Sequence, residues 1–157
     1  MGQTDPGPSH NHCRPPSNFG ASSFSDQLAV VNLLRPSAKQ IQATALQEWT
    51  LDRDISAAEW LTPDVLVVSD SVRPAANGHA LSPCLLAVEI RSPQQSGLFN
   101  KAQTLFAWGT EHVWIIDPFE QEYFEYHGGE RFTKVTSELR TGTLLLSIPA
   151  LRLASTL

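Results

Sequence analysis

Two short apolar runs, at residues 65–68 and 85–90, dominate the pattern of hydrophobic and polar positions along the chain. Pro63 disfavours a helix at the first run, and the β-branched residues of both runs favour strands. Residues 71–83 hold two prolines and Asn77-Gly78, so they predict a loop that turns the chain back. The two runs are therefore expected to pair as antiparallel strands, and the second, apolar without alternation, is typical of a central strand.

Helices are expected on either side of this strand pair. From Ser25, apolar residues at helical spacing predict a short helix that ends before Pro36. Residues 43–51 allow a helical turn or a strand, and we favour a strand. Residues 98–109 predict a second helix, with Lys101 at the border of its apolar face. That face is formed by Leu98, Phe99, Ala102, Leu105, Phe106 and Gly109.

The rest of the chain reads as strands. Residues 113–117 predict a third strand, and the alternating run that follows turns at Gly128-Gly129 into a hairpin ending near Val135. Residues 144–148 predict a last edge strand. This order favours a mixed sheet with helices packed mainly against one end or face, an α/β or α+β architecture.

Asp64 opens the first apolar run and Glu89 nearly closes the second. If the two runs pair as antiparallel strands, both carboxylates meet at one edge of the sheet. Two ionised acids held close together repel each other unless a cation lies between them, and carboxylate oxygens suit Mg²⁺ or Mn²⁺. The pattern therefore indicates a metal-dependent phosphodiesterase.

Four ordered elements carry a family resemblance: Pro63-Asp64, the strand from Val88 to Pro93, Lys101 on a helix, and the strand from Trp114 to Pro118. This order resembles the PD-(D/E)XK nuclease superfamily, and more closely its Uma-type branch of restriction-endonuclease-like proteins. The resemblance implies a restriction-endonuclease-like mixed sheet with flanking helices. It also implies a hydrolase that cuts DNA with Mg²⁺ or Mn²⁺ as cofactor.

The same resemblance implies roles for particular residues. Asp64, Glu89 and the backbone carbonyl of Ile90 would bind the metal. The usual lysine lies two residues after the Glu, where this chain has Arg91, which cannot give up a proton at neutral pH. Uma-type proteins commonly carry the lysine on the following helix, so Lys101 is the candidate catalytic cation. Arg91 is then a phosphate contact in the nucleic-acid-binding surface, or a solvated strand-end charge.

Simpler interpretations stand beside these. Asp64 could cap a turn, and Lys101 could be an ordinary helix-surface lysine. Glu48 is the one acid that could serve as an accessory N-terminal carboxylate, although a solvated strand residue is the favoured interpretation. Asp117 is expected to set a turn. Packing, rather than stacking on unpaired bases, is the favoured role of four aromatic residues: Trp108, Trp114, Tyr123 and Tyr126.

The chain has 157 residues, which predicts a single domain. Residues 1–24, rich in Pro, Gly, Ser, Asn and His, predict a flexible N-terminal arm, and 25–157 the nuclease-like domain. His10, His12 and Cys13 lack the fourth, spaced partner of a metal site. Cys13 and Cys84 are expected to be reduced thiols.

Charge and hydropathy limit the partners. Eleven basic and sixteen acidic residues give a net charge of −5, so any surface for nucleic acid must be local. No apolar stretch approaches the roughly eighteen residues of a membrane span, and the N-terminus lacks a signal pattern. We therefore expect a cytoplasmic protein that does not contact a membrane, and the sequence leaves a homodimer open.

Two functions remain compatible with the sequence. One is a Mg²⁺-dependent endonuclease acting on DNA. The other is a binding or assembly module that keeps the nuclease fold without turnover, which the acidic balance and the absence of a lysine two residues after Glu89 favour. Metal binding separates the two, because only a competent site should gain stability with Mn²⁺.

Overall fold

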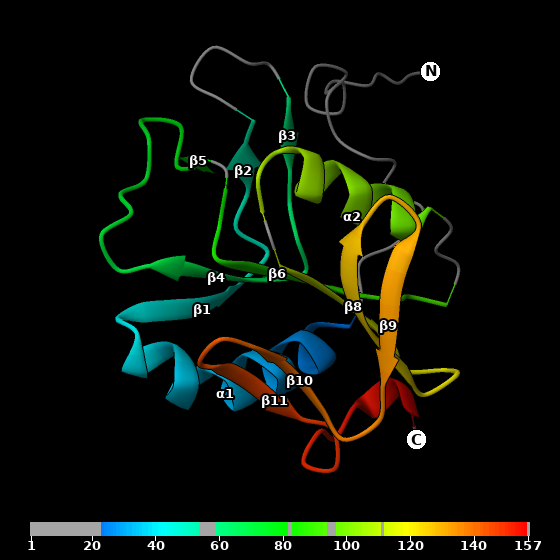
Figure 1. Ribbon diagram of the computed structural model, residues 1–157. Coiled ribbons are helices and arrows are strands. Elements are labelled where there is room, and N and C mark those ends of the chain that lie inside the picture. The colour runs from blue at the N-terminus through cyan, green and yellow to red at the C-terminus, as the bar shows by residue number, and fades with distance from the viewer. Residues whose placement is uncertain (1–22, 54–58, 82, 94–96, 111, 157) are drawn as a thin grey trace, which may run out of the picture.

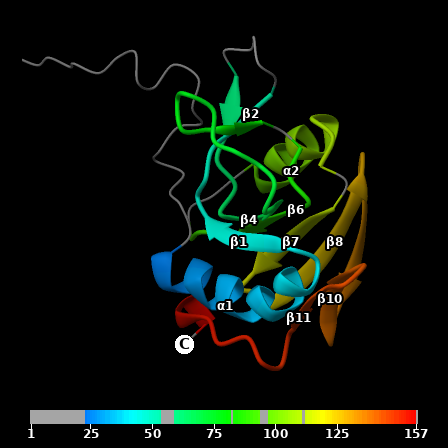
Figure 2. The same cartoon turned by 90° about the vertical axis from the view of Figure 1, so that its left-hand side faces the viewer.

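A six-stranded mixed sheet forms the centre of the molecule in the computed structural model, which describes residues 23–53, 59–81, 83–93, 97–110 and 112–156. Helix α1 (Phe24–Gln40) covers one face of this sheet and α2 (Leu98–Ala107) the other (Figure 1, Figure 2). The strands follow in the order β1 (Ala43–Gln47), β4 (Val65–Ser69), β6 (Leu86–Ile90), β7 (Val113–Asp117), β8 (Glu122–Gly128) and β9 (Arg131–Val135). The expected mixed sheet with flanking helices is confirmed.

The central strand pair has the predicted arrangement. Strands β4 and β6 pair antiparallel with Val65 opposite Val88, and every residue of β6 is buried. Helix α2 then carries the chain across to β7, which runs parallel to β6. The uninterrupted run of apolar residues in β6 is explained, because α1 and α2 cover its two faces.

The loop between β4 and β6 contains a strand that the sequence did not predict. Ala80 and Leu81 form β5, which pairs parallel with β2 (Leu51–Asp52), while β3 (Trp60–Leu61) pairs on the other side of β2. The loop predicted over 71–83 does turn the chain back, and it contains a short strand near its end. A backbone hydrogen bond from the Ala80 amide to the Thr50 carbonyl, 3.0 Å, holds the segment there.

Helix α1 does not end before Pro36, as the sequence predicted, but continues to Gln40. Pro36 lies on the exposed side, so the carbonyl that loses its amide partner can be hydrated. Ala38, fully buried, follows Leu34 by one helical turn and continues the apolar face beyond the proline. Tertiary packing thus overrides the local signal, and Ser23 caps the start of the helix by accepting from the Asp26 amide.

Two further predictions are corrected. The strand expected over 43–51 is two strands, β1 and β2. Glu48 adopts a left-handed backbone with φ of 49° and turns the chain from β1 into the three-stranded sheet of β3, β2 and β5. The strand expected over 144–148 is β11 (Leu144–Ser147), but it pairs with β10 (Glu138–Thr141) in a separate two-stranded sheet. That sheet packs against α1, and β9 is the edge of the central sheet.

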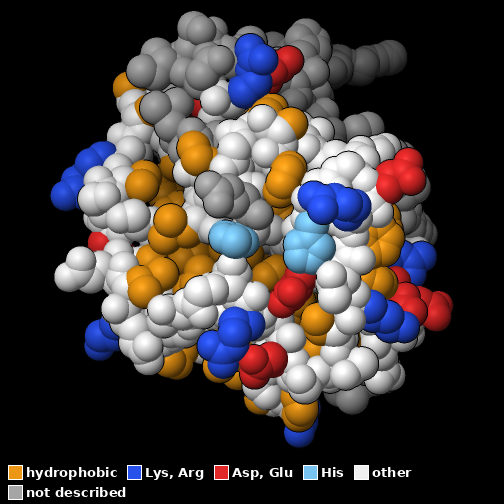
Figure 3. Space-filling view, in the orientation of Figure 1, with side chains coloured by type: hydrophobic (Ala, Val, Ile, Leu, Met, Phe, Trp, Pro, Cys, Tyr) orange, Lys and Arg blue, Asp and Glu red, His pale blue; other side chains and the backbone are white. Residues whose placement is uncertain are grey.

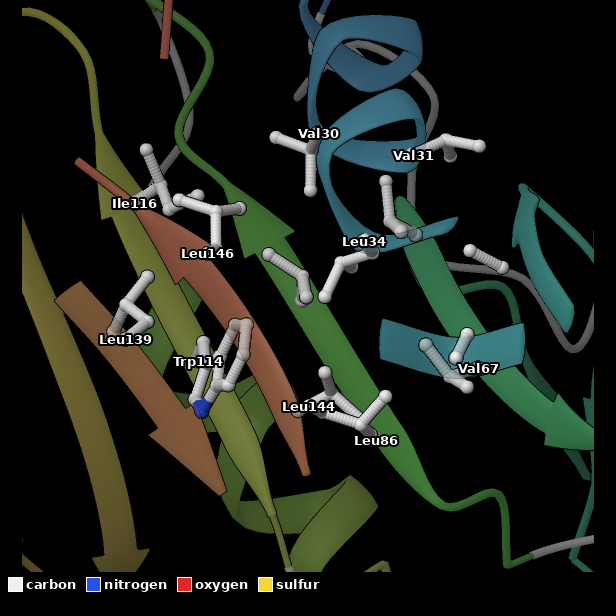
Figure 4. Close-up of a cluster of buried hydrophobic side chains, with 14 of the residues drawn as sticks. Val30, Val31, Leu34, Val67, Leu86, Trp114, Ile116, Leu139, Leu144 and Leu146 are labelled. Atoms are coloured by element: carbon white, nitrogen blue, oxygen red, sulfur yellow. The ribbon is translucent and has the colours of Figure 1, made fainter. Parts of the chain in front are cut away.

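The core has two parts, one on each face of the central sheet. Figure 4 shows the part under α1, where Leu34 meets side chains from the central and two-stranded sheets, with Trp114 at 1% exposure. Under α2, Leu98, Ala102 and Leu105 form the buried face. Phe99 was expected there too, but it is 39% exposed and stacks on Phe132 of β9 instead.

Candidate active site

The strand register brings Asp64 and Glu89 together. Val65 pairs with Val88 in antiparallel strands. Asp64, which precedes Val65, therefore lies opposite Glu89, which follows Val88. The Ile90 amide donates a 2.7 Å hydrogen bond to Asp64 Oδ2, which fixes the aspartate against the end of β6. Asp64 is 6% exposed and Glu89 is fully buried. The structure thus places two carboxylates, 25 positions apart in the sequence, side by side at one end of the sheet.

Lys101 completes this cluster from α2. Its Nζ lies 3.0 Å from Glu89 Oε1 and donates a 2.8 Å hydrogen bond to the Thr62 carbonyl. The neighbouring Ala102 is packed against the sheet, so the helix holds the lysine stem at the edge of the core. The lysine side chain keeps 18% exposure, whereas the glutamate that its ammonium contacts is fully buried.

Electrostatics make this cluster unlike the rest of the interior. Glu89 interacts with the Lys101 ammonium and with the Asp64 backbone, but among the described residues neither contact gives its carboxylate oxygens a well-directed hydrogen bond. Burial raises the pKa of Glu89 to about 8, the charge of Lys101 opposes that rise, and the charge of Asp64 adds to it. Burial alone would lower the pKa of Lys101, but the charges of Glu89 and Asp64 outweigh it and the pKa is raised. One ammonium therefore serves two carboxylates.

Arg91 lies outside this cluster. Its Nη1 contacts Asp117 Oδ2 at 3.3 Å, and its guanidinium lies over the ring of Phe119, 5.8 Å from the ring centroid. Asp117 also sets the turn that the sequence predicted, because its Oδ1 accepts from the amides of Phe119 and Glu120 at 3.0 and 3.1 Å. Arg91, two residues beyond Glu89, therefore contacts the turn after β7.

Sequence reasoning missed Gln27. This residue is fully buried, donates a 2.7 Å hydrogen bond to Glu48 Oε2, and accepts a 3.3 Å hydrogen bond from Gln47. Its signal was present, because Gln27 is a polar residue at helical spacing with Val30, Val31 and Leu34 on the apolar face of α1.

Glu48 lies beside the site, although a solvated residue was the favoured interpretation. Its amide donates to the Asp64 carbonyl at 3.1 Å, and its carboxylate is held by Gln27. Its charge also contributes to the raised pKa of Lys101. Glu48 is exposed, as expected from the sequence, but it also lies next to Asp64, which the favoured interpretation did not include.

The donors present fit one hard divalent cation. Within the described ranges, no group of three or more His, Cys, Asp or Glu side chains could hold a metal ion. Mg²⁺, however, is commonly held by one or two carboxylates, with water and phosphate oxygens completing its coordination. Asp64 and Glu89 supply such a pair, and the Lys101 ammonium alone compensates two buried carboxylates, which leaves charge for a metal ion to balance.

Cys84 is buried and free, and burial raises the pKa of its thiol to about 11. It is a core residue and not a nucleophile. Cys13, with His10 and His12, lies outside the described residues. No helix within the described part of the chain has the length and apolar character needed to cross a membrane.

Comparison with known proteins gives the family and the fold. The model of the Uma2 family, described as "Putative restriction endonuclease", matches residues 15–156. A crystal structure of a putative nuclease belonging to DUF820 from Anabaena variabilis superimposes with a TM-score of 0.62 at 23% identity, covering 87% of this chain and 81% of that one. No curated protein matches the chain. The expected resemblance is confirmed, and the chain belongs to the Uma2 family of putative restriction endonucleases.

Proposed function

We propose that this protein is a Mg²⁺- or Mn²⁺-dependent endonuclease that hydrolyses DNA phosphodiester bonds. The observation that carries the proposal is the buried pair of Asp64 and Glu89, with the Lys101 ammonium 3.0 Å from the glutamate. Burying two carboxylates beside a single cation is costly, and such an arrangement is typical of a functional site. Membership of a family of putative restriction endonucleases supports the nuclease class.

In this proposal Asp64 and Glu89 hold the ion through their carboxylates and Ile90 through its carbonyl. When bound, the ion would supply a Lewis acid for the phosphate and a more acidic water. The amide of Ile90 donates a hydrogen bond to Asp64 and holds that carboxylate in place. The apolar surroundings of Glu89 exclude bulk water, which strengthens each charge interaction at the reacting phosphate.

Lys101 is the proposed catalytic cation. Its ammonium lies 3.0 Å from the glutamate, so a phosphate bound at the Asp64–Glu89 pair would lie within its reach. A lysine there would stabilise the negative charge that develops on the phosphate during attack, or orient the attacking water. The Thr62 carbonyl fixes its direction, since it accepts a hydrogen bond from the same Nζ.

Cleavage of supercoiled plasmid DNA with Mg²⁺ or Mn²⁺ tests the proposal. Asp64→Asn and Glu89→Gln should each abolish metal-dependent cleavage, because each removes a ligand charge with little change of volume. Asp70→Asn is the matched control, since Asp70 lies on the exposed side just beyond the other end of β4. Cleavage at the wild-type rate in either site variant would remove that residue from the mechanism.

One observation favours a second candidate, a nuclease-fold binding module without turnover. Lys101 already forms an ion pair with Glu89, so the lysine could take the place of a metal ion. On the face seen in Figure 3, basic side chains are scattered, and several of them lie beside acidic ones. Thermal melts with Mn²⁺ separate the candidates: a competent site should be stabilised in a way that Glu89→Gln removes, and a module of the second kind should not.

A further inference from the structure

The turn after β7 presents an arginine and an aromatic ring as one unit. Asp117 fixes both, because Oδ2 contacts Arg91 and Oδ1 accepts from the Phe119 amide. The guanidinium carbon is 5.8 Å from the centroid of the Phe119 ring, within the range of a cation–π contact. The two side chains are therefore held together before any ligand arrives.

Both side chains keep capacity for a ligand. Phe119 is 39% exposed and makes no ring contact with another aromatic residue of the described chain. Arg91 is 34% exposed, and a guanidinium has five N–H groups, of which Asp117 engages one within the described residues. A flat apolar surface with free cationic donors beside it matches a nucleobase joined to a phosphate.

Two other exposed rings of the described chain, Phe99 and Phe132, differ from Phe119. They pack on each other and on the half-buried Phe124, with centroids 5.0 to 6.3 Å apart, between α2 and the hairpin of β8 and β9. Their mutual contacts account for their positions, and no cation–π contact joins an arginine to them in the described structure. Phe119 lacks such a structural explanation.

The unit lies next to the candidate active site. Arg91 follows Glu89 by two residues and lies one position beyond the end of β6, where its amide donates to the Ile116 carbonyl at 2.8 Å. The extended pairing therefore continues to Arg91, and alternation directs both side chains toward the same face, roughly 6.6 Å apart along the chain. Because Ile90 pairs with Ile116, Arg91 lies beside Asp117 at the same end of the sheet. The spacing is comparable to one nucleotide step along an extended strand.

We propose that Arg91 and Phe119 form a platform for one unpaired nucleotide adjacent to the bond that is cut. The base stacks on Phe119, and the guanidinium of Arg91 contacts the neighbouring phosphate. This inference rests on the proposed function, and it adds a preference for single-stranded or locally opened DNA, because a paired base in a duplex does not present its face. Stacking makes the platform tolerant of base identity.

Fluorescence anisotropy with a short labelled single-stranded oligothymidylate, in chelating buffer where no cleavage is expected, tests the platform. Phe119→Ala should weaken binding by about tenfold and Phe119→Trp should retain it, because a larger ring still stacks. Phe132→Ala is the matched control, since Phe132 is 43% exposed, and it should bind like the wild type. Binding to a blunt duplex of the same length should change little in any of these variants.

Salt dependence separates the two halves of the platform. Arg91→Met should lower the slope of log affinity against log salt by about 0.7, the value for one phosphate contact on a single strand, and Phe119→Ala should leave the slope unchanged. Equal affinities for Phe119→Ala and the wild type, or equal losses in Phe119→Ala and Phe132→Ala, would overturn the platform.

The outcome is distinguishable from failure of the proposed function. If the protein binds the oligonucleotide through Phe119 but cuts no DNA with any divalent ion, the platform is supported and the nuclease function is refuted. If the protein cuts plasmid DNA and Phe119→Ala binds the oligonucleotide as well as the wild type, the nuclease function is supported and the platform is refuted.

Discussion

Asp26 and Glu89 are both fully buried carboxylates, yet their surroundings differ. Asp26 lies in the first turn of α1, where the helix dipole favours an anion, and its Oδ1 accepts from the Ala154 amide at 2.6 Å and the Ser155 amide at 3.4 Å. Glu89 lies near the end of a strand, where its one ion pair is with Lys101. Asp26 Oδ2 and both Glu89 carboxylate oxygens lack a well-directed hydrogen bond within the described residues, so the two acids differ in the amides and the helix N-terminus at Asp26 Oδ1.

The difference separates a carboxylate that stabilises the fold from one that the fold tolerates. Asp26 ties the C-terminal segment to the start of α1 through backbone groups that would otherwise lose their partners. Glu89 gains too little from its neighbours to offset burial, which its raised pKa reflects. A residue kept at such a cost is expected where chemistry needs it. The predictions below test this contrast.

The largest expected effect is on stability, at Asp26. Asp26→Ala should lower the free energy of unfolding by about 3 kcal/mol, because it leaves the Ala154 amide without its acceptor and removes charge-assisted hydrogen bonds. Urea unfolding measures it. Glu120→Ala, an exposed acid, is the control and should stay within about 0.5 kcal/mol of the wild type. A small effect at Asp26 would remove its structural role.

The next effect is on turnover, at Lys101. Lys101→Met should lower kcat for DNA cleavage by on the order of a hundredfold with metal affinity little changed, because the lysine is not a ligand. Arg91→Met should weaken DNA binding instead. Single-turnover cleavage and metal titration measure the two variants. Loss of turnover in Arg91→Met, with normal cleavage in Lys101→Met, would move the catalytic cation to the residue two beyond Glu89.

A smaller effect concerns pH, measured on metal-free protein. The pKa of Glu89 rises from 4.5 to about 8 on folding, so the stability from its neutral form is complete below 4.5 and is lost as pH rises through about 8. Glu89→Gln removes this dependence. The variant should therefore gain stability relative to the wild type between pH 5 and 8, by about 1 kcal/mol for each pH unit. A constant difference across that range would mean that Glu89 is solvated.

The smallest effect is expected at the N-terminus. Residues 1–22 contain few apolar side chains, and α1 begins at Phe24 with its cap at Ser23. Deleting residues 1–22 should shift the unfolding midpoint by no more than about 1–2 °C, measured by a thermal melt. A large drop would mean that this segment packs on the domain and that the domain extends beyond 25–157.

Much of the site could be predicted from the sequence. Pro63 before an apolar run, a turn-rich segment and a second apolar run sufficed to predict an antiparallel pair, and that pairing places Asp64 near Glu89 by geometry alone. The border position of Lys101 on its helix likewise follows from spacing at 100° per residue. These signals are local, or join neighbouring strands, so few alternatives compete with them.

The network around Gln27 could not be predicted in the same way. Gln27 meets Glu48 because α1 packs across β1, and Glu48 points toward it because its left-handed backbone redirects the chain. Each contact joins segments whose relative placement depends on the whole core. The same applies to Asp26 and Ala154, which lie 128 residues apart in the sequence.

The sequence by itself determined the central strands, the second helix, and the two acids and one lysine of the candidate site, because short-range periodicity and strand pairing are encoded in neighbouring residues. Only the tertiary structure decided that α1 passes through Pro36, that 144–147 leaves the central sheet, and that Arg91 turns toward Asp117 and Phe119. Those outcomes depend on burial and on partners distant in the chain, whose free energies exceed the local preferences that the sequence displays.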